Sequence, residues 1–263
     1  MNVQFDFSVN EKTYGVIGER NLKLYIFQPV TQKKDRTAIL FFNGGSFNKG
    51  KYTAAQFQHQ ANYFSSIGIV SICVDYRNAN DEEFSPIQAI SDAKTAVRWV
   101  RQNSNDLGVD PEKIVMCAAS SGGYTAVSSI MFENINNEND DIYISNIPNA
   151  LVIFAAGMNG LDITERLFPE LKAMAHQISP MHNIKKCLPP TIWFCGTADI
   201  AFEQNKKFCN EMVKVGNTCM FIPYEGMEHG FFNYGLHQNI PYNDTNQQIE
   251  IFLRSLGFVN RSI

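Results

Sequence analysis

Short apolar segments alternate with amphipathic helical segments along most of this chain, and this alternation constrains the fold more than any other feature. The apolar runs predict strands at 22–27, 37–42, 69–74, 113–117, 150–155, 191–195 and 218–223. Helical spacing of apolar residues predicts helices at 53–67, 89–101, 122–132, 202–215 and 247–256. Short apolar strands that alternate with helices are typical of a parallel sheet covered on both faces. We therefore predict an α/β fold, a three-layer α/β/α sandwich.

The chain has 263 residues, with no internal repeat and no linker that would divide it, so we predict one domain over 1–263. Two stretches interrupt the alternation. Residues 133–149 are rich in Asn, Asp and Glu and predict a solvated surface loop. Residues 157–184 are more apolar and follow a predicted strand end, which favours a small lid over a site there. A helical excursion at the side of the domain is the alternative.

Composition and charge argue against several classes of protein. With 22 basic and 26 acidic residues the net charge is -4, which provides no electrostatic footprint for nucleic acid. No apolar run is long enough to span a membrane. The first residues lack a basic stretch followed by an apolar core, so we expect a cytoplasmic protein, although a signal removed beforehand would leave no trace.

The six cysteines show neither a Cys-x-x-Cys pair nor zinc spacing with histidine, so we expect no metal and no cofactor. We interpret them as small buried hydrophobic residues in a reduced compartment. They are Cys73, Cys117, Cys187, Cys195, Cys209 and Cys219.

A serine stands where a predicted strand gives way to a predicted helix. Ser120 is followed by Ser121 and two glycines, a pattern close to the Gly-x-Ser-x-Gly of a nucleophile elbow, with Ala118 in place of the first glycine. Small residues around a serine are also common at helix N-caps, so this segment alone leaves both interpretations open. Ser121 is a rival nucleophile, but the Ser-x-Gly spacing favours Ser120.

Two further polar residues follow predicted strand ends. Asp199 comes after the strand at 191–195, and His229 comes after the strand at 218–223. The carboxyl ends of parallel strands meet at one edge of a sheet, so Ser120, Asp199 and His229 are expected to meet there. A histidine base can activate a serine hydroxyl, and a carboxylate can orient that histidine. Asp199 as an N-cap of the helix at 202–215, and Glu203 as the acid, are the alternatives.

The tetrahedral intermediate of acyl transfer needs hydrogen-bond donors for its oxyanion. The sequence from Asn43 through two glycines to Ser46 follows an early predicted strand. We predict that the backbone N–H groups of Gly45, Ser46 and Ser121 form an oxyanion hole, with Gly44 shaping the turn.

Several stretches together resemble one known superfamily. They are Phe-Phe-Asn-Gly-Gly-Ser-Phe at 41–47, Val-Asp-Tyr-Arg at 74–77, Asp-Ala-Lys-Thr-Ala-Val-Arg-Trp-Val-Arg at 92–101, Val-Asp-Pro-Glu-Lys-Ile at 109–114, Ser-Ser-Gly-Gly at 120–123, Gly-Thr-Ala-Asp at 196–199 and Glu-His-Gly-Phe at 228–231. On these motifs the chain resembles the carboxylesterase/lipase branch of the α/β-hydrolase superfamily, especially bacterial esterases related to hormone-sensitive lipase and to acetyl-xylan-type esterases. The resemblance implies a mostly parallel eight-stranded sheet and cofactor-free ester hydrolysis through an acyl-enzyme. It also assigns the triad to Ser120, Asp199 and His229.

The chain departs from that pattern at three places. The family's His-Gly-Gly-Gly run is Asn-Gly-Gly-Ser from Asn43 onward, which keeps the backbone donors but loses the histidine's hydrogen bonds. Ala118 is expected to strain the elbow slightly. The segment before the first predicted strand is too short for the helical cap of many relatives. The pocket is then open, closed by 157–184, or closed by a partner subunit in a homodimer.

The combined expectation is a serine carboxylesterase that acts on short-chain acyl esters of small molecules or carbohydrates. A serine peptidase of the prolyl-oligopeptidase kind and a catalytically silent binding module on the same fold are the alternatives. We also expect an ion pair between Asp75 and Arg77, or support of the oxyanion loop by these two residues, and expect Arg98 to tie its helix to a turn. The candidates for the pocket rim are Phe47, His182, Phe231, Phe232 and Tyr234.

Overall fold

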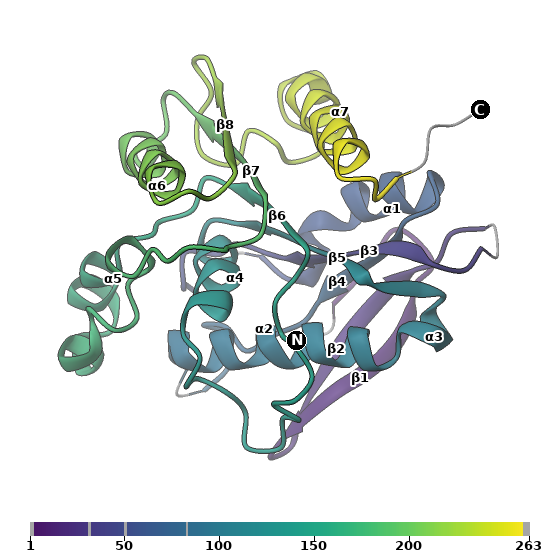
Figure 1. The fold of residues 1–263 in the computed structure, drawn as a ribbon, viewed down its shortest axis with the longest axis horizontal. Helices are drawn as coiled ribbons and strands as arrows, with labels where there is room; N and C mark the ends of the chain where they lie inside the picture. The colour runs from purple at the N-terminus through teal and green to yellow at the C-terminus, as the bar shows by residue number, and fades with distance from the viewer. Residues whose placement is uncertain (1–2, 31–32, 50–51, 83, 260–263) are drawn as a thin grey trace.

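An eight-stranded sheet runs through the centre of the computed structural model, which describes residues 3–30, 33–49, 52–82 and 84–259 (Figure 1). Its strands are β1 (Asn10–Ile17), β2 (Arg20–Phe27), β3 (Arg36–Phe42), β4 (Val70–Val74), β5 (Val109–Ala119), β6 (Ala150–Phe154), β7 (Thr191–Gly196) and β8 (Cys219–Tyr224). Their order in the sheet is β1-β2-β4-β3-β5-β6-β7-β8. Only the pairings of β2 with β1 and β4 are antiparallel. The predicted mostly parallel sheet is confirmed.

Helices cover both faces of the sheet, so the predicted three layers are confirmed (Figure 1). One face packs against η1 (Ala54–Phe57), α1 (Gln58–Ser66) and α7 (Ile240–Ser255). The other packs against α2 (Pro86–Gln102), α3 (Ser104–Leu107), α4 (Ser121–Met131) and α6 (Phe202–Lys214). Alternate residues of β5 belong to the cores on opposite faces of the sheet. Met116 and Ala118 pack in the core beneath α2 and α4, and Cys117 and Ala119 pack in the core beneath α1 and α7.

The sequence analysis did not predict the elements whose residues are too polar to show the apolar periodicity of a strand or a helix. Strand β1 was not predicted, because most of its residues are exposed, and in the sheet it pairs with β2 alone. Helix α7 begins at Ile240 rather than at 247. The excursion at 157–184 contains α5 (Gly160–Leu167), η2 (Pro169–Met174) and η3 (Pro180–His182), and a last short turn, η4 (His237–Asn239), precedes α7.

The expected ion pair between Asp75 and Arg77 is wrong. Asp75 pairs with Arg20 at 2.8 Å, because β2 lies beside β4 in the sheet. Arg77 pairs with Asp92 of α2 at 2.7 Å. These partners come from other elements of the fold, which local spacing does not reveal.

Arg98 ties its helix to a turn as expected. Its Nη1 lies 2.5 Å from Oδ2 of Asp140, and both side chains are buried. Because Asp140 belongs to the loop at 133–149, that loop is not simply solvated. Its acidic side chain anchors it to α2.

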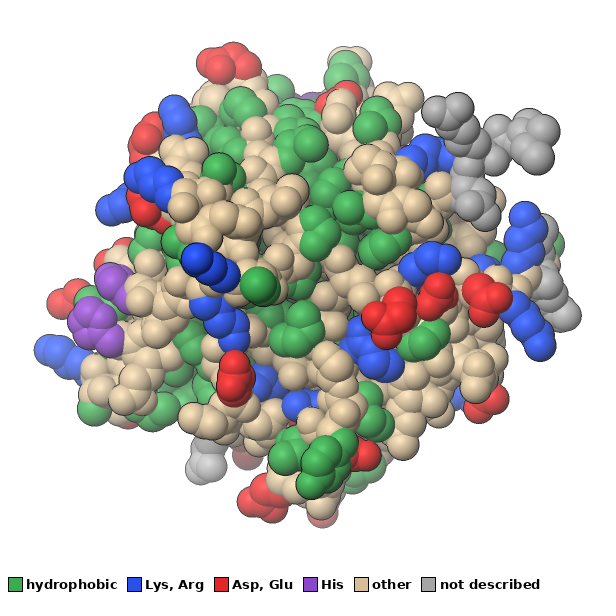
Figure 2. All heavy atoms as spheres, viewed as in Figure 1, with side chains coloured by type: hydrophobic (Ala, Val, Ile, Leu, Met, Phe, Trp, Pro, Cys, Tyr) green, Lys and Arg blue, Asp and Glu red, His purple; other side chains and the backbone are tan. Residues whose placement is uncertain are grey.

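The face shown in Figure 2 carries acidic and basic side chains interspersed with each other. All six cysteines are free, and Cys73, Cys117, Cys195 and Cys209 are buried. Cys187 is exposed, so the interpretation as a small buried residue is wrong for it. Among the helices of the described residues, none combines the length and the apolar character needed to cross a bilayer.

Candidate active site

Three polar side chains from distant parts of the chain meet where β5, β7 and β8 end. His229 Nε2 lies 3.0 Å from Ser120 Oγ. His229 Nδ1 lies 2.7 Å from Asp199 Oδ2. The structure thus brings the three predicted residues into one hydrogen-bonded chain, and it is Ser120, not Ser121, that reaches the histidine.

Ser120 occupies a strained turn between β5 and α4. Its φ of 53° and ψ of -122° are unusual for a residue with a side chain, a strain that costs on the order of 1–3 kcal/mol. Its N–H donates to the carbonyl of Phe154 at 2.9 Å, which anchors the turn to β6. A Cβ atom at Gly122 would lie 2.4 Å from the carbonyl oxygen of Asn43, so only glycine fits there. Ala118 lies in regular strand, so the strain falls on the nucleophile candidate rather than on the residue where we expected it.

Asp199 is fully buried and both of its oxygens are engaged. Oδ2 faces His229, while Oδ1 accepts the backbone N–H of Ala201 at 2.8 Å, just before α6 begins. The alternative of a helix-capping aspartate is therefore partly right, since one carboxylate does both tasks. Glu203, the alternative acid, is exposed on the first turn of α6. The bond to Ala201 fixes the carboxylate in the orientation that His229 needs.

The loops that carry Asp199 and His229 are hydrogen-bonded to each other. The N–H of Thr197 donates to the carbonyl of Tyr224 at 2.9 Å, and the N–H of Ala198 donates to that of Met227 at 3.0 Å. The loops approach so closely that a Cβ atom at Gly196 would lie 2.0 Å from the carbonyl oxygen of Met227. We call this approach the β7–β8 loop contact. It sets the position of the acid relative to the base.

The loop after β3 presents free backbone donors beside Ser120. Ser46 has a left-handed φ of 54°, and the N–H of Gly44 is occupied by Gln56 Oε1 at 2.7 Å. Within the described residues, the N–H groups of Gly45, Ser46 and Ser121 have no protein acceptor. Ser121 is the first residue of α4, where an N–H has no partner within the helix. These three donors, which the sequence predicts for the oxyanion hole, are therefore unoccupied in the described part of the chain.

Gln56 joins the loop after β3 (the donor loop, which carries Gly45 and Ser46) to the loop that carries His229 (the histidine loop). Sequence reasoning missed this role. Its Nε2 donates to Asn233 Oδ1 at 3.1 Å, and Asn233 Nδ2 donates to the carbonyl of Gly230 at 2.8 Å. Gln56 thus bonds both Gly44 and the loop that carries His229. Its partners lie 12 and 177 positions away, so no local pattern could reveal them.

Asn43 stands where the resemblance to the superfamily led us to expect a histidine, and it forms hydrogen bonds of its own. Its Nδ2 donates to the carbonyl of Gly44 at 2.7 Å, and its own carbonyl accepts the Tyr76 hydroxyl at 2.6 Å. Asn43 is buried, so these bonds satisfy polar groups that water cannot reach. The loop is therefore held in place without an imidazole.

Two hollows open on either side of Ser120 and His229. The larger, of about 270 Å³, is walled by Ser46, Phe47, Ser121, Tyr124, Ala155, Gly157, Ile163, Arg166, Leu167, Asp199, Ile200 and Ala201. The smaller, of about 140 Å³, is walled by Gly44, Gly45, Ser46, Tyr52, Gln56, Ala119, Gly230, Phe232 and Asn233. A hollow of about 400 Å³ lined by Lys94, Lys185 and Cys187 is larger, but it contains none of the three hydrogen-bonded residues. We therefore place the site at the two hollows beside Ser120.

The residues expected at the pocket rim have mixed positions. Phe47 lines the larger hollow and Phe232 the smaller one, whereas Phe231 is buried in the core. Tyr234 stacks on His59, with 3.8 Å between ring centroids.

His182 does not contribute to either hollow. Its Nδ1 bonds to Ser179 Oγ at 2.7 Å within the excursion. The excursion at 157–184 does wall the larger hollow, through Ile163, Arg166 and Leu167 of α5.

The fold is that of the α/β-hydrolases, and a serine, histidine and aspartate hydrogen-bonded in that order at the carboxyl edge of its sheet define the class of serine hydrolases. Residues 24–159, just over half of the chain, match the family described as BD-FAE. The chain belongs to this BD-FAE family of α/β-hydrolase esterases.

Solved structures of esterase 2 from the planctomycete Thermogutta terrifontis are similar to this chain throughout. The propionate-bound form is 38% identical, with a TM-score of 0.89, and the similarity covers 97% of each chain. The sarin-phosphonylated form is 37% identical, with a TM-score of 0.90 and the same coverage.

Curated relatives are more distant. The probable isoprenylcysteine alpha-carbonyl methylesterase ICMEL1 of Arabidopsis thaliana is 25% identical over 82% of this chain and 49% of its own length. The carboxylesterase NlhH of Mycobacterium tuberculosis is 26% identical over 48% of this chain and 38% of its own length. The chain thus spans about half the length of the plant relative, and its match to the mycobacterial enzyme covers less.

Proposed function

We propose that this chain is a serine carboxylesterase that hydrolyses short-chain acyl esters through an acyl-enzyme. One observation carries the proposal: the chain of hydrogen bonds from Ser120 through His229 to the buried Asp199, between two hollows. A hydroxyl, an imidazole and a carboxylate in this order form a nucleophile with its base and the group that orients the base.

The geometry determines the steps. Ser120 Oγ attacks the ester carbonyl while His229 Nε2, 3.0 Å away, takes the hydroxyl proton. Asp199 accepts the Nδ1–H and stabilises the imidazolium that forms. The tetrahedral intermediate then collapses: its bond to the alkoxide oxygen breaks, the imidazolium protonates that oxygen so that it leaves as the alcohol, and the acyl group stays on Ser120. Water attacks this ester, its proton goes to His229, and the acid leaves as Ser120 regains its hydrogen.

The negative charge on the carbonyl oxygen develops beside the free N–H groups of Gly45, Ser46 and Ser121. We assign these three donors to the oxyanion hole. Donors that are already oriented cost no reorganisation during the reaction, and loss of one typically costs about 10²–10³ in rate. Gly44 cannot serve, because its N–H is bonded to Gln56.

The size of the smaller hollow and the similar enzyme support a short acyl group. The smaller hollow has about half the volume of the larger one. Thermogutta esterase 2 has been solved with propionate and with butyrate bound. We place the acyl chain in the smaller hollow and the alcohol in the larger.

Sugar esters are the finer proposal for the alcohol. The His229 side chain, which must protonate the alcohol, is 44% exposed, whereas Asp199 is fully buried. A base that is open to solvent leaves room for a bulky polar alcohol such as a sugar.

The test begins with a fluorophosphonate probe, which should label Ser120 as identified by peptide mass spectrometry. Ser120→Ala should abolish labelling and lower kcat for p-nitrophenyl acetate on the order of 10⁶-fold, as expected for a hydrolase without its nucleophile. Ser121→Ala is the matched control and should still be labelled. Labelling of Ser121 would refute the assignment, and full activity of the Ser120 variant would remove it from the mechanism.

The same protein decides between the alternatives. Faster cleavage of dipeptidyl amides than of acyl esters would favour the peptidase. Absence of both labelling and hydrolysis would favour a silent binding module. A series of p-nitrophenyl esters should show the highest kcat/KM at two to four carbons in the acyl group, and acetylated sugars assayed for acetate release test the finer proposal.

A further inference from the structure

The larger hollow contains a cationic side chain that the ester mechanism does not use. Arg166 walls it together with Ile163 and Leu167, and no other Lys or Arg of the described residues does so. Residues 163, 166 and 167 share one face of α5, because they are three and four positions apart. Arg166 therefore belongs to the helix face that borders the pocket.

The position of α5 is set by contacts with the body of the domain. Ile163 is buried in the core, and the N–H of Gly160 donates to Ser179 Oγ at 2.9 Å. Tyr124, one turn after Ser120, donates its hydroxyl to the carbonyl of Ile178 at 2.6 Å. The backbone that carries Arg166 is thus connected to the helix that begins beside Ser120.

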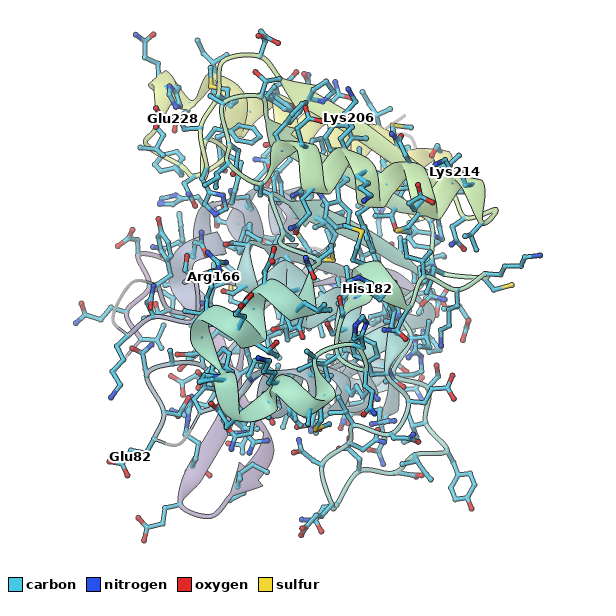
Figure 3. The ribbon with its side chains drawn as sticks, turned by 90° about the vertical axis from the view of Figure 1, so that its left-hand side faces the viewer. Glu82, Arg166, His182, Lys206, Lys214 and Glu228 are labelled. Atoms are coloured by element: carbon cyan, nitrogen blue, oxygen red, sulfur yellow. The ribbon has the colours of Figure 1, made fainter. Side chains whose placement is uncertain are left out.

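The guanidinium of Arg166 has unused donors. Its Nε donates to the backbone carbonyl of Asp162 at 3.3 Å, and within the described part of the chain it forms no ion pair. The one carboxylate that lines the hollow, Asp199, is already bonded to His229 and Ala201. Figure 3 shows Arg166 on α5, on the same side of the molecule as Glu228 of the histidine loop.

We propose that Arg166 binds an anionic group on the alcohol portion of the substrate, so that short-chain acyl esters whose alcohol carries a carboxylate are preferred over their neutral counterparts. A guanidinium presents its donors in a planar fork that matches a carboxylate, and a single free fork on an otherwise mostly apolar wall selects for one anion. The inference rests on the proposed esterase function and on the placement of the alcohol in the larger hollow.

Two esters of nearly the same shape test this. 4-Acetoxybenzoate carries the anion, and 4-acetoxybenzamide is its neutral counterpart. In Arg166→Gln the kcat/KM for the benzoate should fall roughly fivefold relative to wild type, mainly through KM, which is the size of a partly exposed ion pair. The kcat/KM for the benzamide should change less than twofold. Because each variant is compared with wild type on the same ester, intrinsic leaving-group reactivity cancels.

The control is Lys172→Gln, which removes a positive charge from the same excursion but away from the hollow. This variant should have the wild-type kcat/KM for both esters. The preference of wild type for the benzoate should also shrink in about 0.5 M NaCl, because salt screens exposed charges.

Each contrary result is distinguishable. An equal loss on both esters in Arg166→Gln would mean a structural role and would overturn this inference while leaving the esterase intact. p-Nitrophenyl hydrogen succinate carries its carboxylate on the acyl portion. If Arg166→Gln lowers kcat/KM for this ester but not for the benzoate, the placement of Arg166 beside the alcohol portion is overturned. Hydrolysis of none of these esters by wild type would instead refute the proposed function.

Discussion

The two sides of the larger hollow are built differently. The catalytic edge, formed by Ser120, Asp199 and His229, stands at the ends of β5, β7 and β8 and is held by hydrogen bonds to β6, to the residue before α6 and between the loops. The α5 wall, formed by Ile163, Arg166 and Leu167, comes from an excursion outside the sheet, and Arg166 and Leu167 are exposed. The difference teaches that the three hydrogen-bonded residues are fixed by the sheet and its loops, whereas the proposed specificity residue stands on a segment outside the sheet.

The strongest test of the catalytic edge is Asp199→Asn. The amide oxygen can still accept the Ala201 N–H, so its NH₂ group then faces His229 Nδ1 and forces the wrong tautomer. We expect kcat for p-nitrophenyl acetate to fall about 10⁴-fold, with the thermal unfolding midpoint nearly unchanged. A loss of less than tenfold would show that Asp199 is not the orienting acid.

Gly196→Ala tests the β7–β8 loop contact. The added Cβ would lie 2.0 Å from the carbonyl oxygen of Met227, so the loops must separate. We expect kcat/KM to fall about 100-fold because the base moves relative to the acid. The free energy of unfolding, measured in urea, should fall by roughly 1–3 kcal/mol. The control is Gly15→Ala on β1, where the added Cβ would meet nothing closer than 3.4 Å. This variant should change neither kcat/KM nor the free energy of unfolding.

Gln56 tests whether the donor loop needs support from η1. In Gln56→Met both bonds, to Gly44 and to Asn233, disappear. We expect kcat to fall about tenfold with little change in KM, because looser oxyanion donors weaken transition-state binding.

Two other variants refine the Gln56 prediction. Gln56→Glu keeps the acceptor for Gly44 and should recover part of the rate. Gln58→Met, which removes a bond to the Asp6 N–H away from the site, should retain wild-type kinetics. Wild-type kcat in Gln56→Met would show that the loop needs no such support.

The smallest effect is expected on the α5 wall. Leu167→Ala removes exposed apolar surface from the larger hollow. We expect KM for esters with an aromatic alcohol to rise about two- to threefold, kcat to stay the same, and the free energy of unfolding to change by less than about 0.5 kcal/mol. A loss of kcat comparable to that of Gln56→Met would contradict the separation of the two regions.

The fold could be predicted where burial produces a local pattern. Strands β3, β4, β6 and β7 are short apolar runs buried on both faces, and their sequences show this directly. Strand β1 and the first part of α7 have no such pattern, because long-range pairing and packing hold them. The predicted ion pair between Asp75 and Arg77 was wrong for the same reason, because their actual partners, Arg20 and Asp92, are distant in the sequence.

The candidate site was predictable for a related reason. Residues just after parallel strands must gather at one edge of the sheet, so the residue types at those positions, a serine, an aspartate and a histidine, already indicated their chemistry. Gln56 and Arg166 carry no such positional signal. A glutamine within a predicted helix and an arginine on an excursion look like ordinary surface residues until the surrounding loops are placed.

The sequence by itself determined the layered α/β architecture, the identity of the three side chains that meet in one hydrogen-bonded chain and the loop with free donors, because strand periodicity, strand ends and glycines are local properties. Only the tertiary structure decided that Ser120 rather than Ser121 faces the imidazole, that one carboxylate bonds both Ala201 and His229, and that a cation stands in the wall of the larger hollow. These depend on distances of about 3 Å between groups many positions apart, which chain packing sets and local propensity does not.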